Sequence, residues 1–121
     1  MSGTSPIFVK TSDLLVWLEP ALAKFPKEQR FRLAARIEDS LMRFYDLILH
    51  AARTKNQLFL LKEADLELER LRMLVRAAKD IKAMSFQQYQ TASEKINEVG
   101  KILGSWLNKL KEATPAETLA E

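Results

Sequence analysis

Few side chains in this sequence are suited to catalysis. The 121 residues include no cysteine and a single histidine, His50, which excludes thiolate zinc sites, cysteine nucleophiles and disulfides. Asp46 precedes His50 by one helical turn, which resembles half of a metal site. The di-metal sites of helical bundles need Glu-x-x-His motifs on two helices, and the sequence has neither copy. We therefore expect no catalytic residue, metal or cofactor, and keep a metal-binding bundle enzyme around Asp46, His50 and Glu63 as an alternative.

Clustered basic residues are the chemical feature that remains, in a chain of net charge +3. Residues 24–36 carry five cations and one anion, and residues 70–82 carry the same numbers. Cations near the start of a helix oppose its macrodipole, so helix stability does not explain the first cluster. Both clusters suit either a nucleic acid or a plain solvated surface. The candidate phosphate-binding residues are Lys27, Arg30, Arg32, Arg36, Arg72, Arg76 and Lys79.

Two of the three glycines lie in the stretch NEVGKILGSW, which spans residues 97–106. Gly100 and Gly104 are four residues apart, so they share one face of a helix, where each costs about 1 kcal/mol relative to alanine. We interpret the pair as a place where another helix comes close, in the same subunit or in a second one. Trp106 would fill the space beside it.

Hydrophobic residues recur every three or four positions from residue 12 to about residue 112, which predicts an all-α chain. Ser12 is a candidate N-cap for a first, short helix, in which Pro20 predicts a kink or an early break. A second helix is expected from Pro26 to about Arg53.

A third helix follows the polar stretch at residues 53–57, and Ser85 with Gln88 forms a capping box that opens the fourth. Short connections favour antiparallel neighbours, so the expected fold is an up-down-up-down four-helix bundle. Its antiparallel order brings both basic clusters to the same end. We expect a flexible N-terminus at residues 1–11, the bundle at 12–112 and a disordered tail at 113–121.

The location expected from the sequence is the cytoplasm. No apolar run approaches the roughly 18 residues that a membrane span needs, so no membrane partner is expected. The first ten residues also lack the basic start and long apolar stretch of a secretory signal.

From about residue 14 to 110 the chain resembles the Avd family, the accessory variability determinant proteins of diversity-generating retroelements. It is also similar to their wider relatives, the four-helix proteins encoded in ribosomal-RNA intervening sequences. The stretch EVGKILGSW is the most specific match, and Ser85 with Gln88 resembles the start of the family's last helix. LRMLVR and EPALAKFPK are similar to its third helix and to the junction of its first two. FPKEQRFRLAARI is more similar to the intervening-sequence relatives.

The resemblance implies a non-catalytic four-helix subunit that assembles as a homopentameric barrel with a basic surface. Such proteins bind the retroelement's reverse transcriptase and nucleic acid, including template RNA, and they support mutagenic retrohoming. Arg72 and Arg76 match arginines of the family's third helix. The alternative implied by the wider relatives is an intervening-sequence bundle with no reverse transcriptase partner.

Overall fold

Four long α helices and one single-turn helix make up most of residues 5–113, the part of the chain that the computed structural model describes. No strand occurs within these residues, so the predicted all-α bundle is confirmed. The helices are α1 (Pro6–Ala23), α2 (Lys27–Arg30), α3 (Leu33–Ala52), α4 (Gln57–Asp80) and α5 (Phe86–Ala113).

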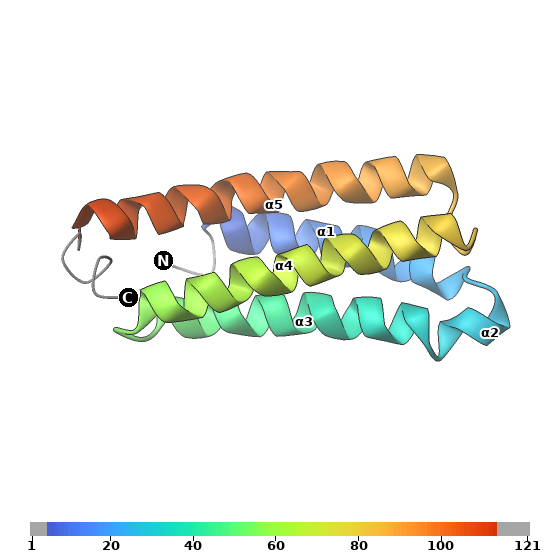
Figure 1. The fold of residues 1–121 in the computed structure, drawn as a ribbon, viewed down its shortest axis with the longest axis horizontal. Coiled ribbons are helices and arrows are strands. Elements are labelled where there is room, and N and C mark those ends of the chain that lie inside the picture. The colour runs from blue at the N-terminus through green and yellow to red at the C-terminus, as the bar shows by residue number, and fades with distance from the viewer. Residues whose placement is uncertain (1–4, 114–121) are drawn as a thin grey trace.

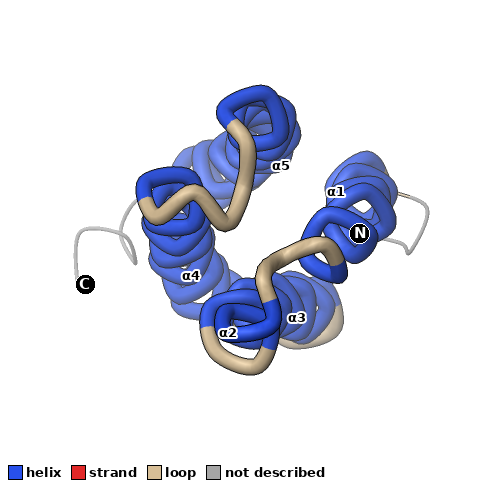
Figure 2. The backbone as a smooth tube through the Cα atoms, turned by 90° about the vertical axis from the view of Figure 1, so that its right-hand side faces the viewer, coloured by secondary structure: helices blue, strands red, loops and turns tan. Residues whose placement is uncertain are grey.

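The long helices alternate in direction along the chain, as Figure 1 shows. Viewed from the end, the long helices stand at the four corners of a square (Figure 2). Helix α4 lies between α3 and α5, and α1 occupies the opposite corner. The α3–α4 contact is the most extensive, followed by α4–α5 and α1–α5. Short loops joining antiparallel neighbours produce this order, as the sequence predicts.

The first helix is longer than the sequence predicts. It begins at Pro6, six residues before Ser12, because proline suits the first turn of a helix and Ile7 is fully buried. The predicted early break at Pro20 is wrong, since α1 continues to Ala23. Proline at this position removes one backbone hydrogen bond. Because only three residues of α1 follow Pro20, this loss affects only the last turn of the helix. Residues 1–4 and 114–121, within the predicted flexible ends, lie outside the described residues.

The expected single helix from residue 26 to 53 is divided in two. The α2 turn ends at Arg30, and α3 starts at Leu33. Phe25 is buried before this turn, and Leu33 packs against the core after it. The chain between these two anchors has to reverse direction from α1 to α3, and this leaves Phe31 exposed at the bend.

The later boundaries agree with the sequence. A break separates Ala52 from Gln57, and the capping box that opens α5 is present. The Gln88 backbone N–H donates to Ser85 Oγ over 3.1 Å, and the Ser85 N–H donates to Gln88 Oε1 over 3.0 Å. At the end of α4, Lys82 takes a left-handed conformation with φ 64°, where helices more often place glycine.

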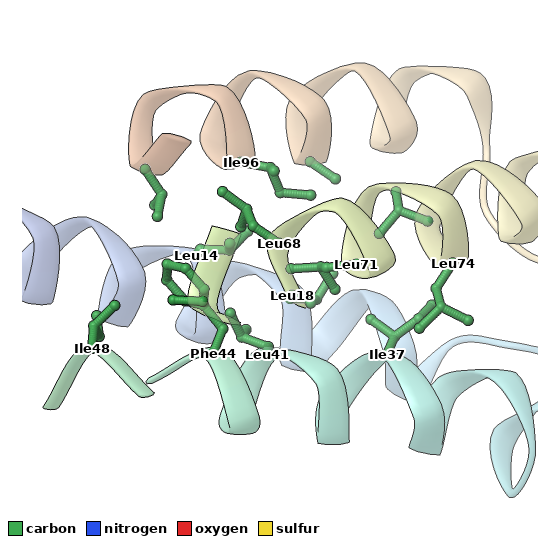
Figure 3. Close-up of a cluster of buried hydrophobic side chains, with 14 of the residues drawn as sticks. Leu14, Leu18, Ile37, Leu41, Phe44, Ile48, Leu68, Leu71, Leu74 and Ile96 are labelled. Atoms are coloured by element: carbon green, nitrogen blue, oxygen red, sulfur yellow. The ribbon is translucent and has the colours of Figure 1, made fainter. Parts of the chain in front are cut away.

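Apolar side chains from all four long helices meet along the bundle axis (Figure 3). Stacking these rows removes apolar area from water, which is the main stabilising term of such a fold. The labelled members are Leu14, Leu18, Ile37, Leu41, Phe44, Ile48, Leu68, Leu71, Leu74 and Ile96.

A buried carboxylate joins α3 to α4. Glu67 is only 5% exposed, and its Oε2 accepts a 2.6 Å hydrogen bond from Ser40 Oγ. Its Oε1 accepts from Arg70 at 2.7 Å and from Arg43 at 3.4 Å. Burial alone would raise the pKa of Glu67, but the hydrogen bonds from Ser40 and Arg43 and the two guanidinium charges outweigh it and lower the pKa. The carboxylate therefore stays ionised and holds the two helices in register.

Candidate nucleic-acid interface

Both basic clusters lie at one end of the bundle. The C-terminus of α1, α2, the start of α3 and the end of α4 all meet at the right-hand side of Figure 1. We call this region the basic end, and its cations are Lys24, Lys27, Arg30, Arg32, Arg36, Arg70, Arg72, Arg76, Lys79 and Lys82. The antiparallel order thus brings together segments that are more than thirty residues apart in the sequence.

These cations differ in how far other groups already neutralise them. Arg32, Arg36 and Arg76 are exposed and make no ion pair with any residue in the range 5–113. By contrast, Arg70 pairs with the buried carboxylate of α4, and Arg72 Nη1 pairs with a Glu69 oxygen at 2.9 Å. The three unpaired arginines, together with the exposed lysines Lys24, Lys27 and Lys82, therefore supply positive charge that remains available to an anion.

Of the other predicted cations, Arg30 and Lys79 make local contacts and Lys27 makes no ion pair with any described residue. Lys27 is exposed at the first position of α2. Arg30 Nε donates to the backbone oxygen of Phe25 at 3.2 Å, which fixes the turn between α1 and α3. Lys79 Nζ lies 3.2 Å from an Asp80 oxygen and 4.7 Å from the centroid of the Tyr89 ring. Its ammonium group thus covers one aromatic ring at the start of α5.

A groove of about 480 Å³ runs along the seam between α4 and α5. Every third or fourth residue of each helix faces it, because that spacing keeps side chains on one face. The lining residues are Glu69, Arg72, Met73, Arg76, Tyr89, Ser93 and Asn97. Two of the predicted arginines therefore share a concave site with an aromatic ring and two polar side chains from the neighbouring helix.

Gly100 makes room for a side chain of α4. A Cβ atom added there would lie 2.7 Å from Arg72 Nη2, so the guanidinium occupies the space that an alanine methyl would fill. A side chain on a helix leans toward the helix N-terminus. The guanidinium of Arg72, on α4, thus lies beside Gly100 of α5. Within the chain, a side chain rather than another helix backbone uses the gap beside Gly100. Gly104 differs, because its added Cβ would meet no described atom within 4 Å apart from its two chain neighbours and the backbone of its own helix.

The family described as bAvd-like matches residues 7–110. The chain belongs to the bAvd-like family. The resemblance to Avd proteins seen in the sequence is thereby confirmed, and the matched region includes both basic clusters and both glycines of α5. No curated protein matches the chain.

This bAvd-like chain also carries an acidic pair that sequence reasoning missed. Glu19 on α1 and Glu38 on α3 line a pocket of about 210 Å³ together with Arg30, at the basic end. A hydrogen bond with Glu38, together with burial and the repulsion of the two charges, raises the pKa of Glu19 from 4.5 to about 7. No local sequence signal could reveal this pair, because its members are 19 residues apart on different helices.

The raised pKa has a defined consequence for stability. Between pH 4.5 and about 7 the folded chain holds a proton on Glu19 that the unfolded chain has released. Stability therefore falls as the pH rises through this window.

Trp106 lies at the opposite end of the bundle from the basic residues and is 8% exposed. Its ring borders a mostly apolar cavity of about 580 Å³ between the start of α1 and the end of α5, with Pro6, Ile102 and Leu110. Trp106 therefore packs inside the chain, as well as shaping this recess.

The remaining sequence hypotheses concern metals and membranes. Within residues 5–113 no three histidine, cysteine or acidic side chains come together in a way that could hold a metal ion, so Asp46, His50 and Glu63 do not form such a group. Among the described helices none has the length and apolar character required to span a bilayer.

Proposed function

We propose that this protein is the non-catalytic accessory subunit of a diversity-generating retroelement, binding nucleic acid and the reverse transcriptase. Its membership of the bAvd-like family supports this role. The observation that carries the nucleic-acid part is the meeting of two basic clusters at one end of the bundle. Charges of one sign repel each other, so their concentration on one surface is better explained by an anionic partner than by folding.

The proposed binding mechanism is electrostatic. Arg32, Arg36 and Arg76 approach phosphate groups and release the counterions that surround the nucleic acid. Contacts of this kind position the partner without reading its bases. Affinity is therefore expected to fall steeply with salt, and the logarithmic slope should decrease by about 0.7 to 0.9 for each phosphate contact that is lost.

We further propose that the chain assembles as a homopentamer. Phe59, Leu66 and Met73 follow one another at seven-residue intervals on α4, and their exposed fractions are 52%, 58% and 58%. This spacing places them on one outer face of the helix, where an uncovered apolar stripe is typical of an interaction surface. Five subunits of net charge +3 would carry a combined charge of +15, which strengthens attraction to nucleic acid.

A charge-removal experiment tests the nucleic-acid site. The triple variant Arg32→Ala, Arg36→Ala, Arg76→Ala should bind RNA more weakly and with a shallower salt slope, while its helical circular dichroism stays unchanged. A matched control removes Arg53, Lys55 and Lys111, three exposed cations at the opposite end. Equal losses in both variants would show that only total charge matters and would contradict a site at the basic end.

Two further measurements separate the parts of the proposal. Light scattering should give a particle of about 70 kDa, five times the 13.9 kDa chain, at both low and high salt. A monomer or dimer would contradict the pentamer. Co-purification with a reverse transcriptase encoded beside this gene tests the partner, and the lack of such a neighbouring gene would favour the intervening-sequence alternative.

A further inference from the structure

Two exposed phenylalanine rings lie at the basic end. Phe31 is 80% exposed at the bend between α2 and α3, directly between Arg30 and Arg32. Phe86 is 63% exposed at the first position of α5. They are the two most exposed aromatic side chains in the part of the chain that the structure describes. Both rings are therefore accessible to a partner, and both lie among the cations of the basic end.

A third aromatic ring continues from Phe86 into the groove between α4 and α5. The Phe86 and Tyr89 ring centroids are 6.3 Å apart, and Tyr89 is half-buried in the groove wall. The ammonium group of Lys79, 4.7 Å from its centroid, holds the Tyr89 ring in place. The aromatic surface thus extends from solvent to a concave site lined by Arg76.

Proteins that bind single-stranded nucleic acids combine exposed aromatic rings with nearby cations. Each unpaired base presents a flat face that stacks on such a ring, while the phosphates pair with nearby arginines. In a duplex these faces are covered by the neighbouring base pairs. We propose that the basic end binds single-stranded nucleic acid, with unpaired bases stacking on Phe31 and Phe86. This inference rests on the proposed nucleic-acid binding and goes beyond it by naming the strand state.

The groove offers polar contacts beside the proposed stacking surface. Ser93 and Asn97 follow Tyr89 at intervals of one helical turn on α5 and line the same wall. Their hydroxyl and amide groups can both donate and accept hydrogen bonds, as the edge of an unpaired base requires. The groove volume of about 480 Å³ lies within the range of pockets that hold small organic groups.

An apolar segment of a protein partner is the competing occupant of the same rings. The charges around them favour the nucleic acid, because Phe31 has an arginine on each side in the sequence and Tyr89 lies under a lysine. An apolar protein surface gains nothing from such flanking cations, whereas a phosphate chain does.

The test compares single-stranded and duplex oligonucleotides of equal length and sequence, using the full chain. Phe31→Ala and Phe86→Ala should each weaken single-strand binding roughly 5- to 150-fold, the loss typical for one stacked base. Duplex affinity and the salt slope should stay at wild-type values, because no phosphate contact changes. Phe31→Tyr should retain binding, since a tyrosine ring also stacks.

Val9→Ala is the matched control, because Val9 is an exposed apolar side chain, 46% accessible, near the start of α1 and away from the basic end. Wild-type protein that binds both strand forms equally, with variants that bind like wild type, would overturn this inference alone. Wild-type protein that binds neither form would overturn the proposed nucleic-acid function as well. Variants that lose only the reverse transcriptase would assign the rings to a protein partner and reject the stacking role.

Discussion

Replacing Gly104 with alanine should stabilise the bundle by about 1 kcal/mol, the difference between glycine and alanine inside a helix. The full difference applies because an added Cβ meets no described atom within 4 Å apart from its two chain neighbours and the backbone of its own helix. For a domain of this size the midpoint of thermal unfolding should rise by roughly 4 °C. The prediction depends on Gly104 facing open space in the functional particle as it does in the single chain.

Gly100→Ala is the comparison, because the same substitution meets a neighbour there. Its Cβ would lie 2.7 Å from Arg72 Nη2 and 3.5 Å from Leu68 Cδ2. The Leu68 contact is ordinary, but the guanidinium must move, which weakens its 2.9 Å ion pair with Glu69. An exposed helical pair of this kind is worth about 0.3–0.5 kcal/mol, so the net gain should be about half that expected at Gly104.

Circular dichroism during heating measures the midpoint of thermal unfolding of both variants. All samples need the same protein concentration, because assembly makes the midpoint concentration-dependent. Light scattering of the same samples reports the particle mass. A Gly104→Ala protein that unfolds at or below the wild-type midpoint would refute the reasoning from open space. A smaller particle in addition would show that a second subunit lies against Gly104.

Two further predictions concern buried or paired carboxylates. Glu67→Gln should lower the unfolding free energy at pH 7 by about 1–3 kcal/mol, because the hydrogen bond from Ser40 loses its charged acceptor. Urea denaturation measures this free energy, and an unchanged midpoint would contradict a stabilising role for the carboxylate. Glu38→Gln should reduce the loss of thermal stability between pH 5 and pH 8, because the amide can donate a hydrogen bond to ionised Glu19 and does not repel its charge. Glu94→Gln, at an exposed position of α5, should keep the wild-type pH dependence, and an equal change in both variants would contradict the paired-carboxylate account.

The sequence predicted most of the fold because helix formation depends on residues close in the chain. The three- to four-residue spacing of apolar side chains indicated the long helices, and the hydrogen bonds of Ser85 and Gln88 confirm the start of α5. The errors occurred where packing outweighs local preference. Ile7 extends α1 forward because it is buried, and the reversal after Phe25 divides the expected second helix.

The position of the candidate site was predictable in outline and not in detail. Two basic segments had to meet at one end once the helices alternated in direction. The groove between α4 and α5, the Arg72 guanidinium over Gly100 and the exposure of Phe31 depend on how neighbouring helices are rotated. Helical periodicity predicts which face is apolar, but it does not give the level at which two faces meet.

The sequence by itself therefore determined the helices, their alternating order and the gathering of positive charge, since each follows from local spacing or from short connections. Only the tertiary structure decided which charges are already neutralised. The buried carboxylate of Glu67 accepts a hydrogen bond from Ser40 of the neighbouring helix. Glu19 of α1 forms a hydrogen bond with Glu38 of α3 that raises the pKa of Glu19. Such contacts depend on distances of a few ångströms between residues far apart in the chain, and only the packed bundle sets those distances.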